Sequence, residues 1–229
     1  MQMESLDNSD SILLTLLQIC DSGFPTGGFS HSMGLECAVT QQFVKSKDSL
    51  KTYMACCLEN IGSFALPFVK EAHQNSADLD SLKKLDDLCS ACISNHVAKR
   101  ASTRQGRSLL DTCFQIYKHN QMSKMSESLM YKHQAIIFGA LCGILGIDLQ
   151  STLIAFVFSS IRAVVTSAVR LDKVGPVEAQ SIQLDLQMKI PDVVVRNFHR
   201  GSHAACMVYS HVDIIQNMHD TMFSKLFYS

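Results

Sequence analysis

The sequence has no tryptophan, only four prolines among 229 residues, and almost no surplus of either charge sign. The formal net charge of −1 argues against nucleic acid or anionic lipid as the main partner, because both attract a basic surplus. The scarcity of proline, together with long stretches of helical periodicity, favours an all-α protein. With 47% hydrophobic and 18% charged residues, the composition is that of a globular chain long enough for one well-buried domain.

A targeting leader and a membrane span are also missing from the pattern. Residues 1–10, MQMESLDNSD, are polar and acidic, without the basic segment that begins a secretory or transit peptide. The two most apolar runs, 135–147 and 152–161, are shorter than the roughly 18 residues that a membrane-spanning helix needs. We therefore expect a polar tail over residues 1–10 and a cytoplasmic protein whose apolar runs are helices inside a bundle.

Nine cysteines, an odd number, are scattered mostly through apolar segments. A disulfide scaffold would be shorter and richer in loops, so buried free thiols in a reducing compartment are the favoured interpretation. Cys89 and Cys92 form a CxxC pair, but no second pair follows to complete a zinc site, and no strand pattern precedes it. We expect both cysteines to be structural.

Apolar spacing predicts a single-domain helical bundle over residues 11–229, with a less ordered C-terminal segment from about residue 193. Gly139 and Gly143, at GxxxG spacing, are expected to pack helices inside the core. Helices are expected over 11–20, with a cap at Asp10 or Ser11, over 31–43 and over 79–117, with an exposed loop at 118–128. A further helix should begin near Leu50, with Asp48 as its cap and a kink or restart at Pro67. Gly146 should end the first of the two apolar helices, Asp148 should cap the second, and a last helix should run from Pro176 to Pro191.

The most unusual stretch is DSGFPTGGFSHSMGLE, residues 21–36, which we call the joint because it separates two helical patterns. A phosphate-binding loop would follow a strand and carry a lysine, and the joint does neither. A nucleophile elbow needs GxSxG between a strand and a helix, but Ser32 stands at the second glycine and the flanks are helical. A hydrolase that uses Ser30 and His31 is therefore disfavoured.

A rigid turn explains the same residues of the joint more simply. Pro25 fixes one backbone angle, Gly27 and Gly28 permit positive φ, and a hydroxyl group is available to cap the next helix. This interpretation makes the joint a structural element that presents a surface.

Five arginines are candidates for partner contacts. Arg100, Arg104 and Arg107 follow helical spacing and form a basic stripe, which is either a solvated face or a dock for an acidic partner surface. Arg162 and Arg170 interrupt an otherwise apolar helix, so each guanidinium must pair internally or reach an interface.

Histidines become frequent toward the C-terminus, and imidazole is a common protein ligand for nickel and zinc. Polar surface histidines are the favoured interpretation, because this region does not show one continuous helical pattern. The alternative is a direct metal carrier, with candidate ligands His199, His203, His211 and His219. Pattern alone yields no convincing catalytic set, which favours an interaction protein over an enzyme.

Three stretches carry a combined pattern in a fixed order. They are LLQICDSGFPTGGFSHSMGLE at 16–36, SAVRLDKVGPVEAQ at 167–180 and HDTMFSKLFYS at 219–229. Together they resemble the UreF family of urease accessory proteins, and the likeness runs from about residue 11 to residue 229. The combination is much more specific than any one of the stretches.

The resemblance implies an all-α, dimeric protein that catalyses nothing itself. It implies an assembly with a second accessory protein, UreD or UreH, and with the GTPase UreG, docked on apo-urease. In that assembly the UreF-like chain recruits UreG and gates its GTPase cycle while nickel is inserted. No cofactor would be bound tightly, nickel would be in transit, and GTP would enter only through UreG.

Partner-binding roles follow from the resemblance and from the basic stripe. The tail, residues 218–229, has Lys225 and Tyr228 where the family favours arginine, and Lys225 keeps the charge but loses the planar fork of a guanidinium. We expect this tail to be poorly ordered alone and to fold against a partner. The partner-binding candidates are Pro25, Thr26, Gly27, Gly28, His31, Glu36, Arg100, Arg104, Arg107, Arg170, Gln180, His219, Lys225, Leu226 and Phe227.

Overall fold

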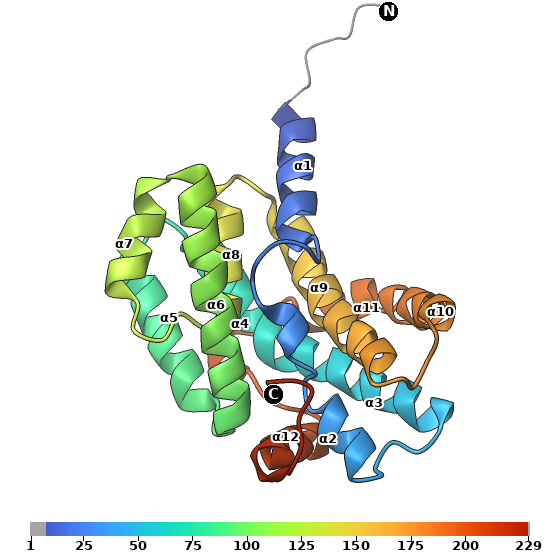
Figure 1. The fold of residues 1–229 in the computed structure, drawn as a ribbon. Helices are drawn as coiled ribbons and strands as arrows, with labels where there is room; N and C mark the ends of the chain where they lie inside the picture. The colour runs from blue at the N-terminus through green and yellow to red at the C-terminus, as the bar shows by residue number, and fades with distance from the viewer. Residues whose placement is uncertain (1–7, 229) are drawn as a thin grey trace, which may run out of the picture.

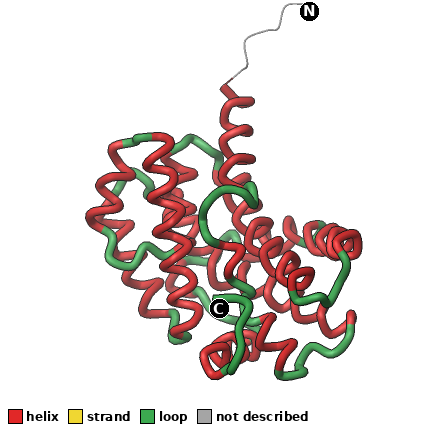
Figure 2. The backbone as a smooth tube through the Cα atoms, in the orientation of Figure 1, coloured by secondary structure: helices red, strands yellow, loops and turns green. Residues whose placement is uncertain are grey.

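The computed structural model describes residues 8–228, and every regular element in that range is a helix (Figures 1 and 2). The α-helices are α1 Asn8–Cys20, α2 Leu35–Thr40, α3 Lys47–Asn60, α4 Leu66–Gln74, α5 Leu79–Cys92, α6 His96–Tyr117, α7 Asn120–Ser128, α8 Gln134–Ile144, α9 Leu149–Arg170, α10 Pro176–Gln187, α11 Ile190–Asn197 and α12 Ser210–Asn217. Short 3₁₀ helices cover Gly28–Ser30, Ser202–Ala204 and Met218–Thr221, and a π-helical turn covers Ile61–Ala65. The predicted all-α class is confirmed, and after Asn197 the chain forms only short helices and turns.

The core is built around α8, in which every residue from Ala135 to Cys142 is buried. Both glycines of the GxxxG pattern face α4. A Cβ on Gly139 would overlap the carbonyl oxygen of Val69, and a Cβ on Gly143 would lie 2.7 Å from the carbonyl oxygen of His73. As predicted, these glycines let two helices of the same chain approach closely.

Helix α9 extends beyond the predicted apolar run at both ends and spans 22 residues. Its length and composition would suffice for a membrane span, but 56% of its most apolar window is buried inside the protein. Because α9 packs against α4, α8 and α10, we interpret it as a core helix of the bundle. The predicted cap is confirmed, since the Asp148 carboxylate accepts a hydrogen bond from the Ser151 N–H at 2.9 Å.

Two predictions for the middle of the chain are wrong. The helix expected over 79–117 is two helices, because Asn95 has an extended backbone and its side chain caps the start of α6. The loop expected at 118–128 is largely α7, in which Met122 and Met125 are fully buried. The two methionines bury one face of this short helix, but two apolar residues are too few to reveal a helical period in the sequence.

The first two helices also differ from expectation. Helix α1 begins at Asn8, so residues 8–10 of the expected polar tail are helical; residues 1–7 lie outside the described range. Helix α2 is shorter than the predicted 31–43, because Gly34 immediately before it has a left-handed φ of 79°. Figure 1 shows α1 projecting from the body of the molecule.

Proline positions show why some helix boundaries were predictable. Pro67 lies in the first turn of α4 after the π-helical turn, so it restarts the helix as predicted, and Pro176 opens α10 as predicted. Pro191 does not end a helix but lies in the first turn of α11, where its fixed φ is favourable. Helix α3 is capped by Ser46 through a capping box, and Asp48 falls inside its first turn.

Candidate functional site

The joint is a tight turn whose shape depends on two glycines. Gly27 has a φ of 71° and precedes a short 3₁₀ helix, whereas Gly28 keeps an ordinary φ, so positive φ was correctly expected only for Gly27. Gly34 also has a positive φ, and a Cβ there would lie 2.8 Å from the Tyr53 hydroxyl and 2.9 Å from Gln216. The joint therefore passes directly between α3 and α12 at a point where no side chain fits.

Hydrogen bonds fix the joint to the body of the protein. The hydroxyl groups of Ser108 and Thr112 on α6 donate to the carbonyl oxygen of Pro25 at 2.7 and 3.3 Å. On the other side, the Tyr53 hydroxyl donates to the Met33 carbonyl oxygen at 3.0 Å. These anchors come from ordinary helix positions, and no motif in the sequence identified them. Both flanks of the joint are helical, so the strand that a nucleophile elbow requires is absent from this part of the described chain.

Glu36 connects the joint to the tail of the chain. Its carboxylate is buried and accepts hydrogen bonds from the backbone N–H groups of Leu226 and Phe227 at 2.5 and 3.1 Å. The buried His219 ring donates to the same carboxylate from Nε2 at 3.2 Å. A buried carboxylate needs such donors, because an unpaired charge inside a protein is strongly destabilising. The Glu36 carboxylate therefore binds the backbone of the tail.

Arg170, at the end of α9, forms a second connection between the joint and the tail. Its guanidinium donates to the carbonyl oxygen of Phe29 and lies 4.2 Å from the centroid of the Phe227 ring. Nearby, the Tyr228 N–H donates to the Ser30 carbonyl oxygen at 2.7 Å. We call the surface formed by the joint, Arg170 and tail residues 218–228 the composite face.

Two arginines of the basic stripe on α6 also hold the tail. Arg100 forms a two-pronged hydrogen bond to Asp220 at 2.8 and 3.0 Å, and Arg104 lies 4.1 Å from the centroid of the Tyr228 ring. The hydrogen bonds from Arg100 hold the pKa of the Asp220 carboxyl well below its usual range. Arg107 instead approaches the Met130 carbonyl oxygen at 3.5 Å. Two-thirds of the predicted stripe thus already contacts an acidic or aromatic group of its own chain.

Several side chains of the composite face remain exposed. Phe223 is fully exposed, and the rings of Phe29 and Tyr228 and the side chain of Leu226 are 66%, 55% and 54% exposed. Lys225 donates to the Asp220 carbonyl oxygen at 3.2 Å and also lies near the tip of the tail. Exposed aromatic rings beside arginines are typical of protein interfaces.

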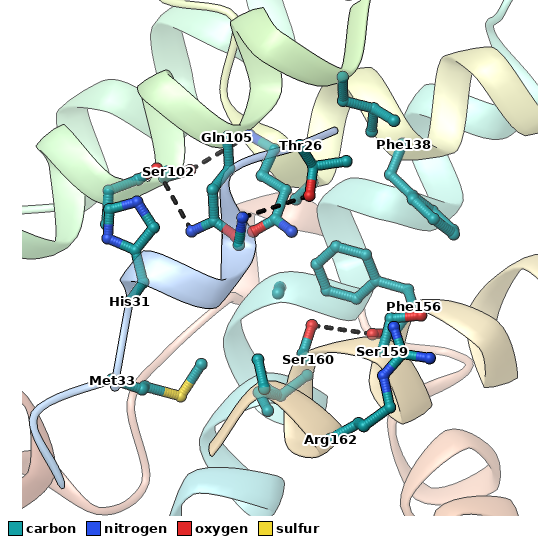
Figure 3. Close-up of a pocket in the computed structure, with 18 of the residues that line it drawn as sticks. Thr26, His31, Met33, Ser102, Gln105, Phe138, Phe156, Ser159, Ser160 and Arg162 are labelled. Atoms are coloured by element: carbon teal, nitrogen blue, oxygen red, sulfur yellow. Dashed lines mark hydrogen bonds between the residues drawn. The ribbon is translucent and has the colours of Figure 1, made fainter. Parts of the chain in front are cut away.

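A cavity of about 450 Å³ lies beneath the joint, between α6, α8 and α9 (Figure 3). The rings of Phe138 and Phe156 line it, and His31, Gln105 and Arg162 contribute polar groups. Burial, with further contributions from Arg104, Arg100 and His219, lowers the pKa of His31 to about 4. His31 is therefore neutral near pH 7. Arg162 finds its partner within the chain, since its guanidinium donates a hydrogen bond to the Cys20 carbonyl oxygen at 2.5 Å.

The C-terminal histidines are not brought together. Three of them, His199, His203 and His211, are exposed, whereas His219 is buried against Glu36. Within residues 8–228 no group of three or more His, Cys, Asp or Glu side chains is arranged to hold a metal ion.

The candidate Thr26 has a local partner inside the joint. Its hydroxyl group accepts a hydrogen bond from the Gly28 N–H at 3.3 Å.

Gln180 is the candidate that the structure places on a different element. It is exposed on α10, between Val177 and Leu184, whereas the other motif residues belong to the joint, the end of α9 or the tail.

Comparison with known proteins identifies relatives along almost the whole chain. A family model described as UreF matches residues 44–187. Urease accessory protein F of Arabidopsis thaliana is 35% identical over 219 residues, which cover 93% of this chain and 90% of the relative. Urease accessory protein F of Oryza sativa subsp. indica is also 35% identical, over 92% of this chain and 82% of the relative.

A bacterial protein is similar to this chain over the whole of its own length. The urease accessory protein UreF of Lachnoclostridium phytofermentans is 28% identical over 230 aligned residues, covering 96% of this chain and 100% of the relative. The family model and the plant relatives agree with the motif resemblance, and all three motif stretches contribute to one face of the helical bundle. The chain therefore belongs to the UreF family, whose members are named as accessory proteins of urease rather than as catalysts.

Proposed function

We propose that this chain is a scaffold for urease maturation in the cytoplasm, where it acts as a chaperone component and not as an enzyme. It forms a homodimer, binds the UreD or UreH accessory protein, and recruits the GTPase UreG. In this assembly it gates the GTPase cycle of UreG and helps to insert nickel into apo-urease. Nickel is cargo in transit, no cofactor is bound tightly, and GTP enters only through UreG.

The convergence of three distant motifs on the composite face is the observation that supports this proposal. Glu36 and the backbone of Leu226 and Phe227 are about 190 residues apart in sequence, yet they are joined by one part-buried and one buried hydrogen bond. The buried side of the face makes these contacts, whereas its outer side exposes the rings of Phe29, Phe223 and Tyr228 and the side chain of Leu226. This arrangement suits a surface whose buried contacts keep it rigid and whose exposed side chains bind another protein.

Co-purification tests the proposal directly. The full chain, co-expressed with the UreD and UreG proteins of the same source, is expected to give a stable complex, and urease from such cells should contain nickel and be active. The variant F223A removes a fully exposed ring and should weaken the complex without changing the fold. F43A, at a 55% exposed ring outside the composite face, is the matched control. Failure of the wild type to associate with either partner would refute the proposal.

Hydrogen exchange addresses the tail separately. We expect backbone amides of the tail beyond Thr221 to gain protection when the partners bind, because an exposed terminal segment is ordered further by docking. Equal protection in the free and complexed protein would contradict the prediction that a partner orders the tail.

A further inference from the structure

The cavity beneath the joint has no part in the proposed scaffold. Its volume of about 450 Å³ lies in the range of cavities that hold small organic ligands. Phe64, Phe138 and Phe156 contribute aromatic rings to its lining, and joint residues 21–29 line it as well (Figure 3). A lining of this kind favours a ligand with a substantial apolar part, because binding removes apolar surface from water.

Arg162 brings a positive charge to the lining of this cavity. Its side chain is only partly exposed, and it donates a hydrogen bond to the neutral carbonyl group of Cys20. It forms no ion pair with any carboxylate in residues 8–228. A partly buried guanidinium without a counter-ion attracts an anion, since protein screens its charge less than water does.

The other titratable groups of the lining do not neutralise Arg162. Asp21 is exposed, and its carboxylate accepts a backbone hydrogen bond within the joint at 2.6 Å. His31 is neutral near pH 7, and burial raises the pKa of the Cys20 and Cys89 thiols, so these thiols stay protonated. The charge on Arg162 therefore favours a negatively charged ligand over a cation in this part of the cavity.

A buried hydroxyl group lies three residues before Arg162 on α9. The Ser159 Oγ atom lines the cavity and, apart from the Cys20 thiol, has no hydrogen-bond partner in the described part of the chain. Residues three apart on a helix lie on the same side of it, so both side chains can reach one ligand group. Buried hydroxyl groups normally form hydrogen bonds, because leaving one unmade costs free energy. A carboxylate can accept from both donors.

We propose that this cavity binds a medium-chain fatty acid, with its carboxylate against Arg162 and Ser159 and its alkyl chain among the rings of Phe138 and Phe156. A hydrogen bond between a guanidinium and a carboxylate is charge-assisted, so it adds direction to the apolar contact. The bound acid also contacts joint residues 21–29 and should hold them in place. The site is separate from the nickel cargo of the proposed function.

Isothermal titration calorimetry with hexanoate, octanoate and decanoate tests the apolar part of the site. For the full chain, each added pair of CH₂ groups should lower the dissociation constant by roughly tenfold, because each buried CH₂ group contributes a similar increment. Affinity that does not depend on chain length would overturn the proposal. So would a wild type that binds none of the three acids.

The variant R162M tests the partner of the carboxylate. It keeps an unbranched apolar side chain but removes the charge, so the decanoate dissociation constant should rise by about tenfold or more. Decanol has the chain without the charge and should bind R162M and the wild type equally, which shows that the cavity is intact. R107M is the matched control, because Arg107 approaches the Met130 carbonyl oxygen and does not line the cavity. Equal decanoate affinity in R162M and R107M would contradict the assignment.

A second variant, S159A, keeps Arg162 and its contact with Cys20. It should weaken decanoate binding by about fivefold and leave decanol binding unchanged, because only the carboxylate uses the hydroxyl group. Decanoate binding that S159A leaves at the wild-type level would remove Ser159 from the site.

NMR of isotope-labelled methionine methyl groups locates the ligand. Decanoate should shift the signal of Met33, which lines the cavity, and leave that of Met130, which is 69% exposed and lies outside the lining. Decanoate that binds without affecting Met33 would overturn the proposed location. These measurements use the chain without partners, so their failure leaves the co-purification test of the scaffold unaffected.

Discussion

The α4–α8 pair and the C-terminal segment, residues 198–228, are held in the protein by different kinds of contact. In the α4–α8 pair, apolar side chains and bare glycine backbone meet, and Gly139 lies directly against Val69. In the C-terminal segment, polar side chains of the body bind the backbone of the segment. The contacts of this kind are Lys70 to the carbonyl groups of residues 198 and 200, Glu71 to the N–H of Ser202, Asn60 to both backbone groups of Tyr209, Asn95 to the carbonyl of Asp213, and Glu36 to the N–H groups of residues 226 and 227.

This difference predicts how a substitution in each region changes the stability of the protein. Close packing in the α4–α8 pair gives cooperative stability, because any added volume must push two core helices apart. Backbone hydrogen bonds to the C-terminal segment act one by one, so the loss of one should free the segment locally. Substitutions in the two regions should therefore differ in how much stability they remove and in how much of the protein they affect.

The largest effect is expected for G139V in the α4–α8 pair. The added side chain would overlap the Val69 carbonyl group and separate the two helices, at a cost of about 3 kcal/mol or more in the free energy of unfolding. Urea unfolding followed by circular dichroism measures the loss. G175A is the control, because no atom lies within 4 Å of a Cβ at Gly175, and it should cost less than about 1 kcal/mol. Equal losses would show that packing at Gly139 is not limiting.

E36A should have a smaller global effect but a clear local one. It leaves the N–H groups of Leu226 and Phe227 and the His219 ring without their shared acceptor. Tail amides should then exchange hydrogen at least about tenfold faster, which corresponds to roughly 1.4 kcal/mol of lost local stability. E36Q keeps the shape and one acceptor oxygen and should give an intermediate rate. If core amides accelerate as much as tail amides, the tail is not a separate unit.

The pH dependence of stability should separate the two regions further. Burial lowers the pKa of His133, which is fully buried at the start of α8, to about 4. Between pH 6.5 and 4 the unfolded chain binds a proton at this position and the folded chain does not. Stability should therefore fall as pH decreases through that window, by up to about 1.4 kcal/mol per pH unit for one such histidine.

H133Q tests this assignment. Urea unfolding at several pH values should give a shallower slope for H133Q than for the wild type, whatever its stability at pH 7. His31 shows the same direction of pKa shift and should account for part of the remaining slope. Identical slopes for H133Q and the wild type would mean that His133 does not titrate differently on unfolding.

The smallest effect is expected for D220N, at the exposed contact between the tail and α6. The Asp220 side chain is about one-third exposed, so solvent screens its pairing with Arg100. Tail exchange should rise only a few-fold, and added salt should reduce the difference between D220N and the wild type. D80N removes the exposed Lys83–Asp80 pair, 3.7 Å long, and should leave tail exchange unchanged.

Sequence reasoning succeeded where a boundary depends on local chemistry. Asp148 as a cap, Pro67 and Pro176 in first turns, and the close packing of Gly139 all follow from rules that involve a few neighbouring residues. The break at Asn95 has a local cause too, because its side chain caps α6, but the apolar period continues across it and hid the boundary.

The candidate site was only partly predictable, because its contacts join distant positions. Glu36 was selected through the family resemblance, and Arg170 also as a guanidinium in an apolar helix, but no spacing rule could connect either residue to the tail. The anchors Tyr53 and Ser108 were missed, since a single hydroxyl on a helix gives no signal until its partner is known. Arg100 contacts an acidic group of its own chain, Asp220, and its contact with an acidic partner surface stays a prediction.

The contacts of Glu36 also bear on how freely the tail sequence can vary. Glu36 binds the amide groups of the tail, which every residue except proline provides, so these two contacts do not depend on which exposed side chains the tail carries. Lys225 contacts the tail only through its side chain, at the Asp220 carbonyl oxygen, so a change there should leave the contacts of Glu36 intact. The main chain of the tail thus sets its position, and exposed side chains such as Phe223 and Leu226 can be exchanged to suit a different partner surface.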